Sequence, residues 1–441
     1  MAAEHRVVIL GGGFGGLYAA QALKHAPVAV TLIDQRNFHL FQPLLYQVAT
    51  GSLSPGEIAA PLRGVLSKQK NTQVLLGEAV DIDPQGKKVL LKDGAQVEYD
   101  SLIVATGSQS VYFGHDEWKQ WAPPLKSVED ATNVRQRILL AFEIAERTTD
   151  LEERRAWLTF VIVGGGATGV ELGGALGEIA NHTLKHEFRS IRPQEAKILI
   201  VDPGTRVLAN FPQDLSRKAE ESLIHLGVRF RGGLKVICVD GQGVIVEDKL
   251  GKHDSICSKT VLWAAGVALS PFGRTLARRT GAPTEKSGKI LVEPDLTVPG
   301  FPDIYAVGDL ESGKNKKGQP LPGVAQVAMQ GGKYAANTII KKLKRKPVQP
   351  FHYFDKGNIA VIGRASAVAE VFGLHLAGLP AWLVWLFIHL MYIVEFQSRV
   401  LVFVQWGLQY LTYGRGARLI TGSSSAGRVE EAEALETSEK R

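Results

Sequence analysis

Two short apolar runs, each followed by a glycine-rich turn, stand out along the chain. Residues 6–10 (RVVIL) precede GGGFGG, and residues 159–163 (TFVIV) precede GGGATG. Each run has the length and the β-branched composition of a buried parallel strand. The residues after each turn follow a helical pattern, LYAAQALKHA in the first case and VELGGALGEIA in the second. The pattern therefore predicts two strand–loop–helix units in one chain.

Further β-rich stretches at residues 74–91 and 228–246 contain turn signals, and each is interpreted as a small antiparallel sheet inserted in a doubly wound unit. Residues 125–146 are helical in pattern and can link the two units. The predicted fold class is α/β, with two Rossmann-like dinucleotide-binding domains. A length of 441 residues fits this organisation, because one hydrophobic core seldom serves so long a chain.

Cysteine usage excludes several classes of protein. The chain has two cysteines, Cys238 and Cys257, and no C-x-x-C pair. A disulfide framework, a zinc ribbon, a four-cysteine iron–sulfur cluster and a redox-active C-x-x-C pair are therefore excluded. Residues 1–5 are short and polar, and the apolar run after them is too short for a signal peptide. We expect a cytoplasmic protein.

The first glycine motif is Gly11-x-Gly13-x-x-Gly16. Its glycines allow a tight turn, close approach of a pyrophosphate to the backbone, and close packing of helix on strand. The phosphates would lie at the positive end of the following helix. Asp34 ends the next predicted strand, where a carboxylate holds an adenosine ribose. A glycine-rich turn with a surface aspartate is the alternative.

The second motif is Gly164-x-Gly166-x-x-Gly169, and its ribose acid is Asp202 at the end of residues 197–201 (KILIV). The gap between motif and acid is long, so a lengthened helix and an insertion are expected. An acid favours NAD over NADP, because a 2′-phosphate would prefer an arginine. Arg206 lies close enough in sequence to leave NADP open.

Three further segments carry a resemblance: residues 99–107 (YDSLIVATG), 261–266 (VLWAAG) and 303–309 (DIYAVGD). With the two glycine motifs, they resemble the flavoproteins that have two dinucleotide-binding domains and a glutathione-reductase-like fold. The resemblance implies FAD at the first site and NAD(P)H at the second. It implies that Asp309 binds the ribityl or pyrophosphate part of FAD, although a strand-end helix cap is the alternative.

The resemblance implies a division of the chain into domains and a set of contacts for each nucleotide. Residues 1–122 and 286–356 form the FAD domain, 123–285 the NAD(H) domain, 357–420 a C-terminal membrane-anchoring region, and 421–441 a disordered tail. The FAD contacts are Gly11, Gly12, Gly13, Phe14, Gly15, Gly16, Asp34, Gln35, Val80, Ala105, Thr106, Gly107, Asp309, Ala325, Gln326 and Lys356. The NADH contacts are Gly164, Gly166, Gly169, Glu171, Asp202, Ala265 and Gly266.

The positions of the cysteines also distinguish between the branches of this family. Disulfide reductases carry a cysteine pair soon after the first ribose acid, whereas residues 37–50 here contain none. The chain resembles the type II NADH:quinone oxidoreductases, most specifically in residues 325–330 (AQVAMQ). Gln326 and Gln330 share one helix face. Their amides suit a quinone carbonyl, although two solvated surface glutamines are the alternative.

By the same resemblance, Glu171 is the active-site glutamate, tied to Lys356. Lys356 would stabilise negative charge that develops at the flavin or the quinone, and Glu171 would relay a proton to the quinol. The alternatives are a helix N-terminal acid matched to the macrodipole for Glu171 and a solvated turn lysine for Lys356.

The C-terminal part contains the most apolar segment. Residues 371–394 lack Asp, Glu, Lys and Arg, a length that can span a membrane. Gly378 and Pro380 interrupt it, and a second apolar run follows from Val400. Three of the seven tryptophans lie between residues 382 and 406, and indole rings favour the headgroup level. We expect paired interfacial helices in one leaflet; a true span and a buried dimer or core face are alternatives.

Together these features predict an FAD-dependent NADH:quinone oxidoreductase that needs no metal and pumps no protons. NADH is its substrate and a quinone its acceptor. Its expected place is the cytoplasmic face of the cell membrane, as a homodimer that contacts lipid and the quinone pool and binds no nucleic acid. A reductase of a soluble protein acceptor, or of a demethylated biosynthetic quinone, is the alternative.

Overall fold

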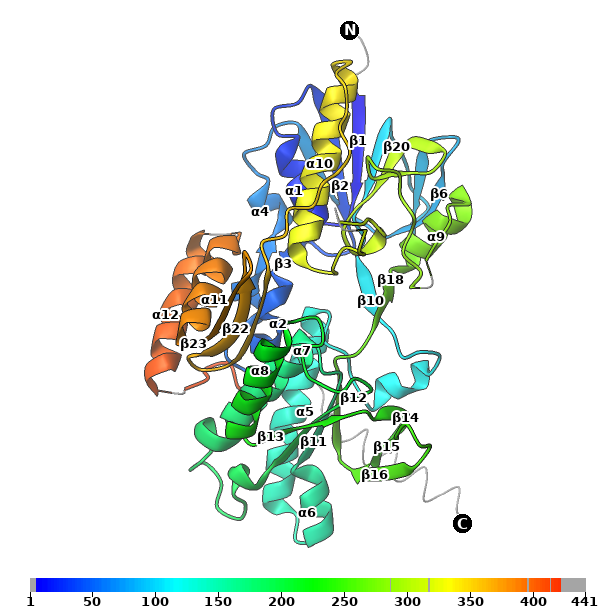
Figure 1. The fold of residues 1–441 in the computed structure, drawn as a ribbon. Coiled ribbons are helices and arrows are strands. Elements are labelled where there is room, and N and C mark those ends of the chain that lie inside the picture. The colour runs from blue at the N-terminus through cyan, green and yellow to red at the C-terminus, as the bar shows by residue number, and fades with distance from the viewer. Residues whose placement is uncertain (1–4, 286, 316–317, 395, 413, 422–441) are drawn as a thin grey trace.

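The computed structural model describes residues 5–421 except 286, 316–317, 395 and 413. The tail predicted to be disordered, 421–441, lies almost wholly outside the described residues. Two α/β units lie one above the other, and a C-terminal unit lies along one flank of both (Figure 1).

The first unit is built on a six-stranded sheet in the order β19-β20-β9-β1-β2-β5. Its neighbouring strands are parallel, apart from the antiparallel pair β19–β20. The apolar first motif strand is fully paired on both sides, as its composition predicts. The strands are β1 (His5–Leu10), β2 (Val28–Asp34), β5 (Thr72–Leu76), β9 (Ser101–Val104), β19 (Thr297–Val298) and β20 (Phe301–Ala306). Helices α1 (Phe14–Ala22) and α10 (Ala325–Leu343) pack against each other.

The second unit repeats the arrangement with a four-stranded parallel sheet in the order β13-β12-β11-β17. Its strands are β11 (Thr159–Val163), β12 (Lys197–Asp202), β13 (Val228–Gly232) and β17 (Thr260–Trp263). Its helices are α5 (Val128–Arg147), α6 (Leu151–Trp157), α7 (Ala167–Glu178) and α8 (Gln213–His225). The predicted α/β class with two Rossmann-like units is confirmed.

Each unit carries a small antiparallel sheet, but each predicted stretch began one strand too early. Residues 74–76 and 228–232 belong to β5 and β13 of the parallel sheets. Periodicity shows that a segment is extended and half-buried, whereas the direction of its neighbour depends on the fold. The antiparallel strands are β6 (Ala79–Asp83), β7 (Lys88–Leu91) and β8 (Gln96–Glu98), and β14 (Lys235–Asp240), β15 (Gly243–Glu247) and β16 (His253–Cys257).

The second glycine-motif helix is longer than the first, as expected, since α7 has 12 residues and α1 has 9. The α-helix α7 ends at Glu178 and continues as a π-helix over Ile179–Thr183, and a loop with a 3-10 helix at Pro193–Glu195 leads to β12. The lengthened helix and the insertion expected before Asp202 are therefore both present.

The two units are connected where β10 (Ser108–Ser110) pairs antiparallel with β18 (Val267–Leu269). Helix α9 (Pro271–Thr280) then packs into the core of the first unit, with Phe272 and Leu276 buried among residues of β1 and β9. The boundary at residue 285 remains a prediction, and these contacts place the return to the first unit earlier in the chain.

Short elements of the first unit lie between β2 and β5 in the sequence. They are β3 (Phe38–Leu40), β4 (Ala59–Pro61), α2 (Leu45–Ala49), α3 (Pro55–Ile58) and α4 (Leu62–Val65). Helix α2 packs on α5 and α7 of the second unit.

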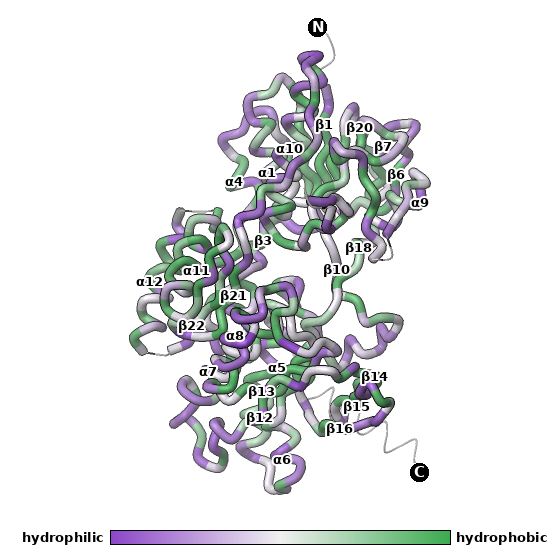
Figure 2. Tube along the Cα trace, viewed as in Figure 1, coloured by the Kyte–Doolittle hydropathy of each residue, from purple (hydrophilic) through white to green (hydrophobic). Residues whose placement is uncertain are grey.

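The C-terminal unit is a three-stranded antiparallel sheet followed by two helices. Its elements are β21 (Asn358–Gly363), β22 (Ser366–Val371), β23 (Leu374–Gly378), α11 (Leu379–Tyr392) and α12 (Phe396–Thr412). Hydrophobic residues recur along both helices in Figure 2. The run of residues 371–394 therefore begins in a β-hairpin. Among the described residues, no helix has both the length and the apolarity to cross a membrane.

Candidate functional site: a cleft joining two glycine loops and a buried glutamate

A cleft of about 2370 Å³ connects both glycine loops with the C-terminal unit. Its lining includes Gly13 and Gly15 of the first loop, Gly166 of the second, and residues 387–389, 391 and 392 of α11. This volume exceeds that of a typical single small-molecule pocket, which is about 300–1,000 Å³. The cleft therefore has room for more than one large ligand.

The first loop has the backbone that a phosphate cradle requires. Gly11 has φ +99°, in the region that side chains rarely adopt. A Cβ at Gly16 would lie 1.8 Å from the carbonyl oxygen of Gly11, so helix α1 can approach the strand only with glycine there. The Gly12 N–H donates to Asp34 Oδ2 at 2.5 Å, and the Arg36 N–H donates to Asp34 Oδ1 at 2.7 Å.

The second loop repeats this geometry. Gly164 has φ +115°, and a Cβ at Gly169 would lie 1.9 Å from the Gly164 carbonyl oxygen. Asp202 accepts hydrogen bonds from the Gly165 N–H at 2.7 Å and the Gly204 N–H at 2.6 Å. Both acids stand at the end of the second strand of their unit, and both fix the loop that a nucleotide would contact.

Most of the predicted FAD contacts line the cleft, but three do not. Gly12 and Gly16 are not part of the cleft lining, and a Cβ at Gly12 would collide with the side chain of Leu62. Val80 lies on β6 with 38% of its surface exposed, next to Ala79, which lines the cleft. The lining residues are Gly11, Gly13, Phe14, Gly15, Asp34, Gln35, Ala105, Thr106, Gly107, Asp309, Ala325, Gln326 and Lys356.

Of the predicted NADH contacts, Gly166 and Glu171 line the cleft. Gly164 and Gly169 shape the loop from behind. Ala265 and Gly266 lie just before Val267 and Ala268, which do line it. The Asp202 carboxylate accepts hydrogen bonds from the Gly165 and Gly204 N–H groups and does not line the cleft. The contacts of these residues with a nucleotide remain predictions.

The N-terminus of α10 fixes the segment that carries Lys356. Gln326 Nε2 donates to the Gly357 carbonyl at 2.9 Å. Gln330 Nε2 donates to the Phe354 carbonyl at 2.9 Å, and the Phe354 N–H donates back to Gln330 Oε1 at 2.9 Å. Gln326 Oε1 is buried and has no hydrogen-bond partner among the described residues. One glutamine is therefore fully engaged with the backbone, and the other keeps an acceptor for a bound group.

Glu171 is half-buried, and loss of hydration raises the pKa of its carboxyl to about 8, opposed by a hydrogen bond from the Val361 N–H. No ion pair with Lys356 is found among the described residues. Lys356 Nζ instead lies 2.9 Å from the hydroxyl of Tyr392 on α11.

Several cleft residues carried no signal in the sequence. Lys126 Nζ lies 3.7 Å from Asp309, and the Ser108 hydroxyl donates to Asp309 at 2.5 Å. His389 Nδ1 lies 2.7 Å from the Trp385 carbonyl oxygen, and burial lowers the pKa of His389 to about 4. Such residues come from segments far apart in sequence and belong to no local motif, so spacing does not reveal them.

Comparison with known proteins agrees with this geometry. The family model for pyridine nucleotide-disulphide oxidoreductases matches residues 5–332. The type II NADH:quinone oxidoreductase Ndh of Mycobacterium tuberculosis is 44% identical over 97% of this chain and 92% of its own length. The chain belongs to the type II NADH:quinone oxidoreductase family. The branch predicted from the cysteines and from residues 325–330 is confirmed.

Two further members of the wider group show the range of this architecture. The structure of NDH2 from Plasmodium falciparum in complex with NADH superimposes with a TM-score of 0.85 at 21% identity, covering 95% of this chain and all of that one. The demethylphylloquinone reductase NdbB of Synechocystis is 31% identical over 92% of this chain and 96% of its own length. The type II NADH:quinone oxidoreductase fold therefore extends over the C-terminal unit.

Proposed function

We propose that this enzyme oxidises NADH and reduces a membrane quinone, with FAD held at the first glycine loop. The observation that carries the proposal is the continuity of one cleft from both glycine loops to the apolar helix α11. Nucleotides and a lipid-soluble acceptor can thereby meet in one space. The 44% identity to a protein named for this reaction supports it.

The residues of the first unit fit FAD. The N-terminus of α1 and the loop N–H groups suit its pyrophosphate, and Gln326 Oε1 is a buried acceptor without a protein partner. FAD, when bound, supplies the two-electron chemistry that joins a hydride donor to a quinone. The protein contributes binding and position, through Asp34 at one end of the cleft and Asp309 further along it.

Glu171 and Lys356 line the same cleft and give it an acid and a cation. The reaction converts NADH, one proton and a quinone into NAD⁺ and a quinol. Because its carboxyl is protonated at neutral pH, Glu171 can supply that proton. Lys356, oriented by Tyr392, places positive charge where negative charge develops. We propose that no proton crosses the membrane in this reaction.

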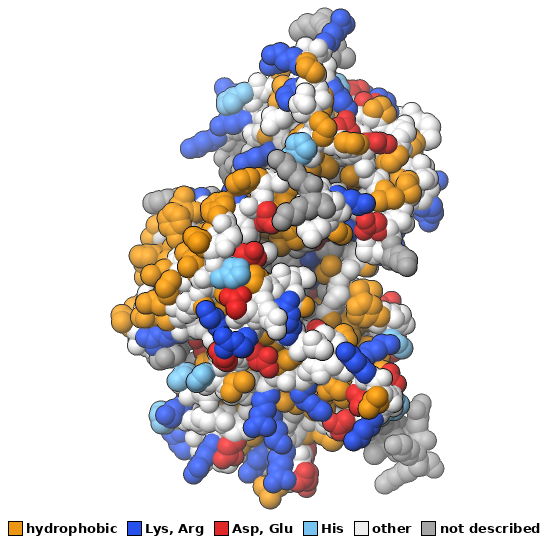
Figure 3. Space-filling model, in the orientation of Figure 1, with side chains coloured by type: hydrophobic (Ala, Val, Ile, Leu, Met, Phe, Trp, Pro, Cys, Tyr) orange, Lys and Arg blue, Asp and Glu red, His pale blue; other side chains and the backbone are white. Residues whose placement is uncertain are grey.

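Helices α11 and α12 provide the surface on which we propose the enzyme binds lipid, at the cytoplasmic face. Exposed apolar side chains gather over these helices in Figure 3. On α11 they recur at every fourth position, on the face opposite the buried Ala381, Trp385 and His389. The exposed apolar residues of the two helices are Leu379, Leu383, Phe387 and Met391 on α11, and Val400, Leu401, Phe403, Val404, Leu408 and Leu411 on α12. A contiguous apolar patch of this kind marks an interaction site. The expected homodimer remains a prediction.

An anaerobic stopped-flow experiment tests the function. The purified protein should be yellow, NADH should bleach the flavin band, and ubiquinone or menaquinone should restore it. A demethylated naphthoquinone belongs in the same series, because the Synechocystis relative is named for such a substrate. A folded protein without flavin, or a flavin that NADH reduces and no quinone reoxidises, would contradict the proposal. Preference for the demethylated quinone alone would favour a biosynthetic role.

A Gln330→Leu variant should separate the two half-reactions. It removes both hydrogen bonds to the Phe354 backbone, so the segment carrying Lys356 is held to α10 less firmly, with the Gln326–Gly357 hydrogen bond retained. We expect quinone reduction to fall about tenfold, the equivalent of one to two hydrogen bonds, with flavin reduction by NADH nearly unchanged. Stopped-flow measurement of both steps checks this, with Gln319→Leu, an exposed glutamine at the rim of the cleft, as the control. An equal loss in both steps would refute the assignment.

A further inference from the structure

Gly12 of the first glycine loop is fixed by hydrogen bonds on both of its backbone groups. Its N–H donates to the Asp34 carboxylate at 2.5 Å. Its carbonyl oxygen lies 2.9 Å from Nδ1 of His39, which stands on β3. A carbonyl oxygen can only accept a hydrogen bond, so Nδ1 carries the hydrogen and His39 is the donor. The loop is therefore held from the cleft side by an acid and from the interior by an imidazole.

The direction of the Gly12 carbonyl determines the direction of the next N–H. The C=O of Gly12 and the N–H of Gly13 belong to one planar trans peptide, so they point in opposite directions. Because the carbonyl is directed at the buried ring of His39, the Gly13 N–H is directed away from that ring. Gly13 lines the cleft, and a Cβ added there would meet no atom within 4 Å. Gly13 is also the N-cap of α1, the end of a helix that favours a phosphate.

The second glycine loop contains the same arrangement with a different donor. The Gly165 N–H donates to Asp202, and the Gly165 carbonyl accepts from the Leu208 N–H at 2.8 Å. Gly166, the N-cap of α7, has φ −75° and ψ −175°, against −69° and −165° for Gly13. Leu208 supplies its N–H from a left-handed conformation, φ +49°, which side chains rarely adopt. One peptide orientation is thus fixed twice by unrelated groups, which indicates that the ligand of each loop needs it.

Packing alone does not account for a histidine at position 39. The ring is 1% exposed, and its Nε2 is buried with no hydrogen-bond partner among the described residues. A buried polar atom without a partner is destabilising, so phenylalanine would fill this space at a lower cost in free energy. Burial also lowers the pKa of His39, so the ring is neutral at pH 7 and holds its one hydrogen on Nδ1. The hydrogen bond to Gly12 is therefore what distinguishes histidine from an apolar ring here.

The ring of His39 also supports the first residue of α1. Phe14 lines the cleft and meets His39 edge to face, with ring centroids 5.0 Å apart and an interplanar angle of 86°. Phe41 packs against the same Phe14 ring with centroids 5.8 Å apart. His39 therefore contacts the residues on both sides of Gly13.

From these contacts we infer that His39 is a positioning residue for FAD, because its Nδ1–H fixes the Gly12–Gly13 peptide with the Gly13 N–H available to the pyrophosphate. The inference rests on the proposed function, which places FAD at the first loop. Without the hydrogen bond this peptide can rotate, and ordering it again on binding costs conformational entropy. The affinity for FAD should therefore fall, whereas the activity of enzyme saturated with FAD should not.

Two exchanges at position 39 separate the hydrogen bond from the packing of the ring. His39→Phe keeps an aromatic ring and removes the donor, so we expect affinity for FAD to fall about tenfold, the loss of one hydrogen bond to a buried carbonyl. His39→Asn places an amide N–H near the position of Nδ1 and should keep the affinity within about threefold of the original enzyme. The fluorescence of flavin released on dilution of each holoenzyme measures this affinity. With FAD at saturation, quinone turnover should agree within about twofold among all the proteins.

Gln69→Leu is the matched control. Gln69 is buried in the same unit and donates to the Ala20 carbonyl of α1 at 2.7 Å, so its loss also removes a buried hydrogen bond to this helix, away from the glycine loop. This variant should retain FAD as the original enzyme does. Phosphorus NMR of the bound cofactor gives a second measurement, in which the pyrophosphate resonances should move in His39→Phe and stay in place in Gln69→Leu.

The outcomes distinguish the role of His39 from the proposed function. Equal release of FAD from His39→Phe and Gln69→Leu would overturn the inference, and so would a loss of affinity in His39→Asn as large as that in His39→Phe, which would assign the effect to packing. The proposed function would fail in another way, because the original enzyme itself would then carry no flavin, or a flavin that does not pass electrons from NADH to a quinone.

Discussion

Exchange of Glu171 for glutamine should lower quinone reduction about a hundredfold, the lower end of what a positioned general acid contributes. The substitution keeps the shape of the side chain and removes the proton that can be transferred. Flavin reduction by NADH needs no proton from this residue, so it should remain within about twofold of the original enzyme. In the unaltered enzyme the quinone step should decline as pH rises through about 8, the pKa to which burial raises Glu171. In the variant that decline should vanish.

The same variant should be more stable in alkaline solution. The carboxyl holds its proton up to about pH 8 in the folded protein, whereas in the unfolded chain it releases the proton near pH 4.5. The free energy of unfolding therefore falls as pH rises between these two values, and it does not recover above them. Glutamine removes this loss, worth roughly 1–3 kcal/mol for a buried carboxyl.

Thermal melts of both holoenzymes at pH 5 and pH 8 measure this effect. The difference in melting temperature should be small at pH 5 and should favour Glu171→Gln at pH 8. A variant with normal quinone turnover, or one whose melting temperature stays constant relative to the original enzyme across this range, would show that Glu171 is neither the acid nor a protonated buried group.

Charged residues on the exposed face of α11 should release the enzyme from lipid. Leu379 and Leu383 are one turn apart, about half exposed and outside the cleft lining, so glutamates there leave the core and the cleft intact. Each side chain contributes about 1.5–3 kcal/mol when transferred from water to an apolar phase. Loss of both, at about half burial each, should weaken binding to vesicles about a hundredfold. Soluble NADH oxidation with a short-chain quinone should persist.

Flotation with vesicles of mixed neutral and anionic lipid measures this binding. Leu151→Glu with Leu250→Glu is the matched control, because both leucines are exposed on the second unit, away from α11 and α12. Deletion of the C-terminal helices is a poorer test, because Trp385 and Trp406 are buried in a core shared with α2 and α7, and their loss would unfold the enzyme around them. Undiminished flotation of the α11 variant would place the lipid contact elsewhere.

Local sequence predicted the parts of the site that depend on the backbone. The glycine loops could be located because a positive φ at Gly11 and Gly164, and the contacts of Gly16 and Gly169, admit no side chain. The acids Asp34 and Asp202 followed from strand length, because a parallel strand of known start ends at a predictable residue. These relations act over a few residues, which is why one sequence contains them.

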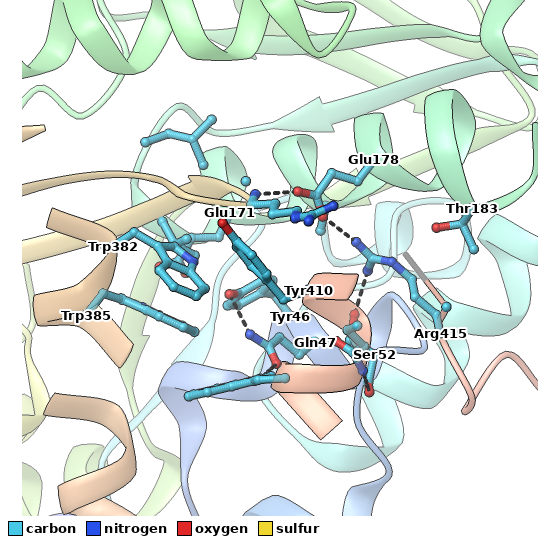
Figure 4. Close-up of a pocket in the computed structure, with 18 residues that line it drawn as sticks. Tyr46, Gln47, Ser52, Glu171, Glu178, Thr183, Trp382, Trp385, Tyr410 and Arg415 are labelled. Atoms are coloured by element: carbon cyan, nitrogen blue, oxygen red, sulfur yellow. Dashed lines mark hydrogen bonds and ion pairs between the residues drawn. The ribbon is translucent and has the colours of Figure 1, made fainter. Parts of the chain in front are cut away.

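The sequence did not predict the contacts in the site between residues that are distant along the chain. The ion pair of Arg415 with Glu178 joins residues 237 positions apart, and Lys356 contacts Tyr392 rather than Glu171. A cavity of about 100 Å³, lined by Tyr46, Glu178 and Arg415 among others, exists only because α2, α7 and the C-terminal helices meet there (Figure 4). Pairings of this kind depend on how distant elements pack, and no spacing along the chain encodes them.

The sequence alone therefore determined the two dinucleotide folds, the family branch and the presence of an apolar C-terminal pair of helices. It did not determine which face of α11 is exposed, because that helix is apolar on all sides and its pattern marks no polar face. Packing of Ala381, Trp385 and His389 against the rest of the enzyme decides it, leaving Leu383 and Phe387 outside. The partly buried position of Glu171, and with it the raised pKa of its carboxyl, likewise arises only when the three units come together.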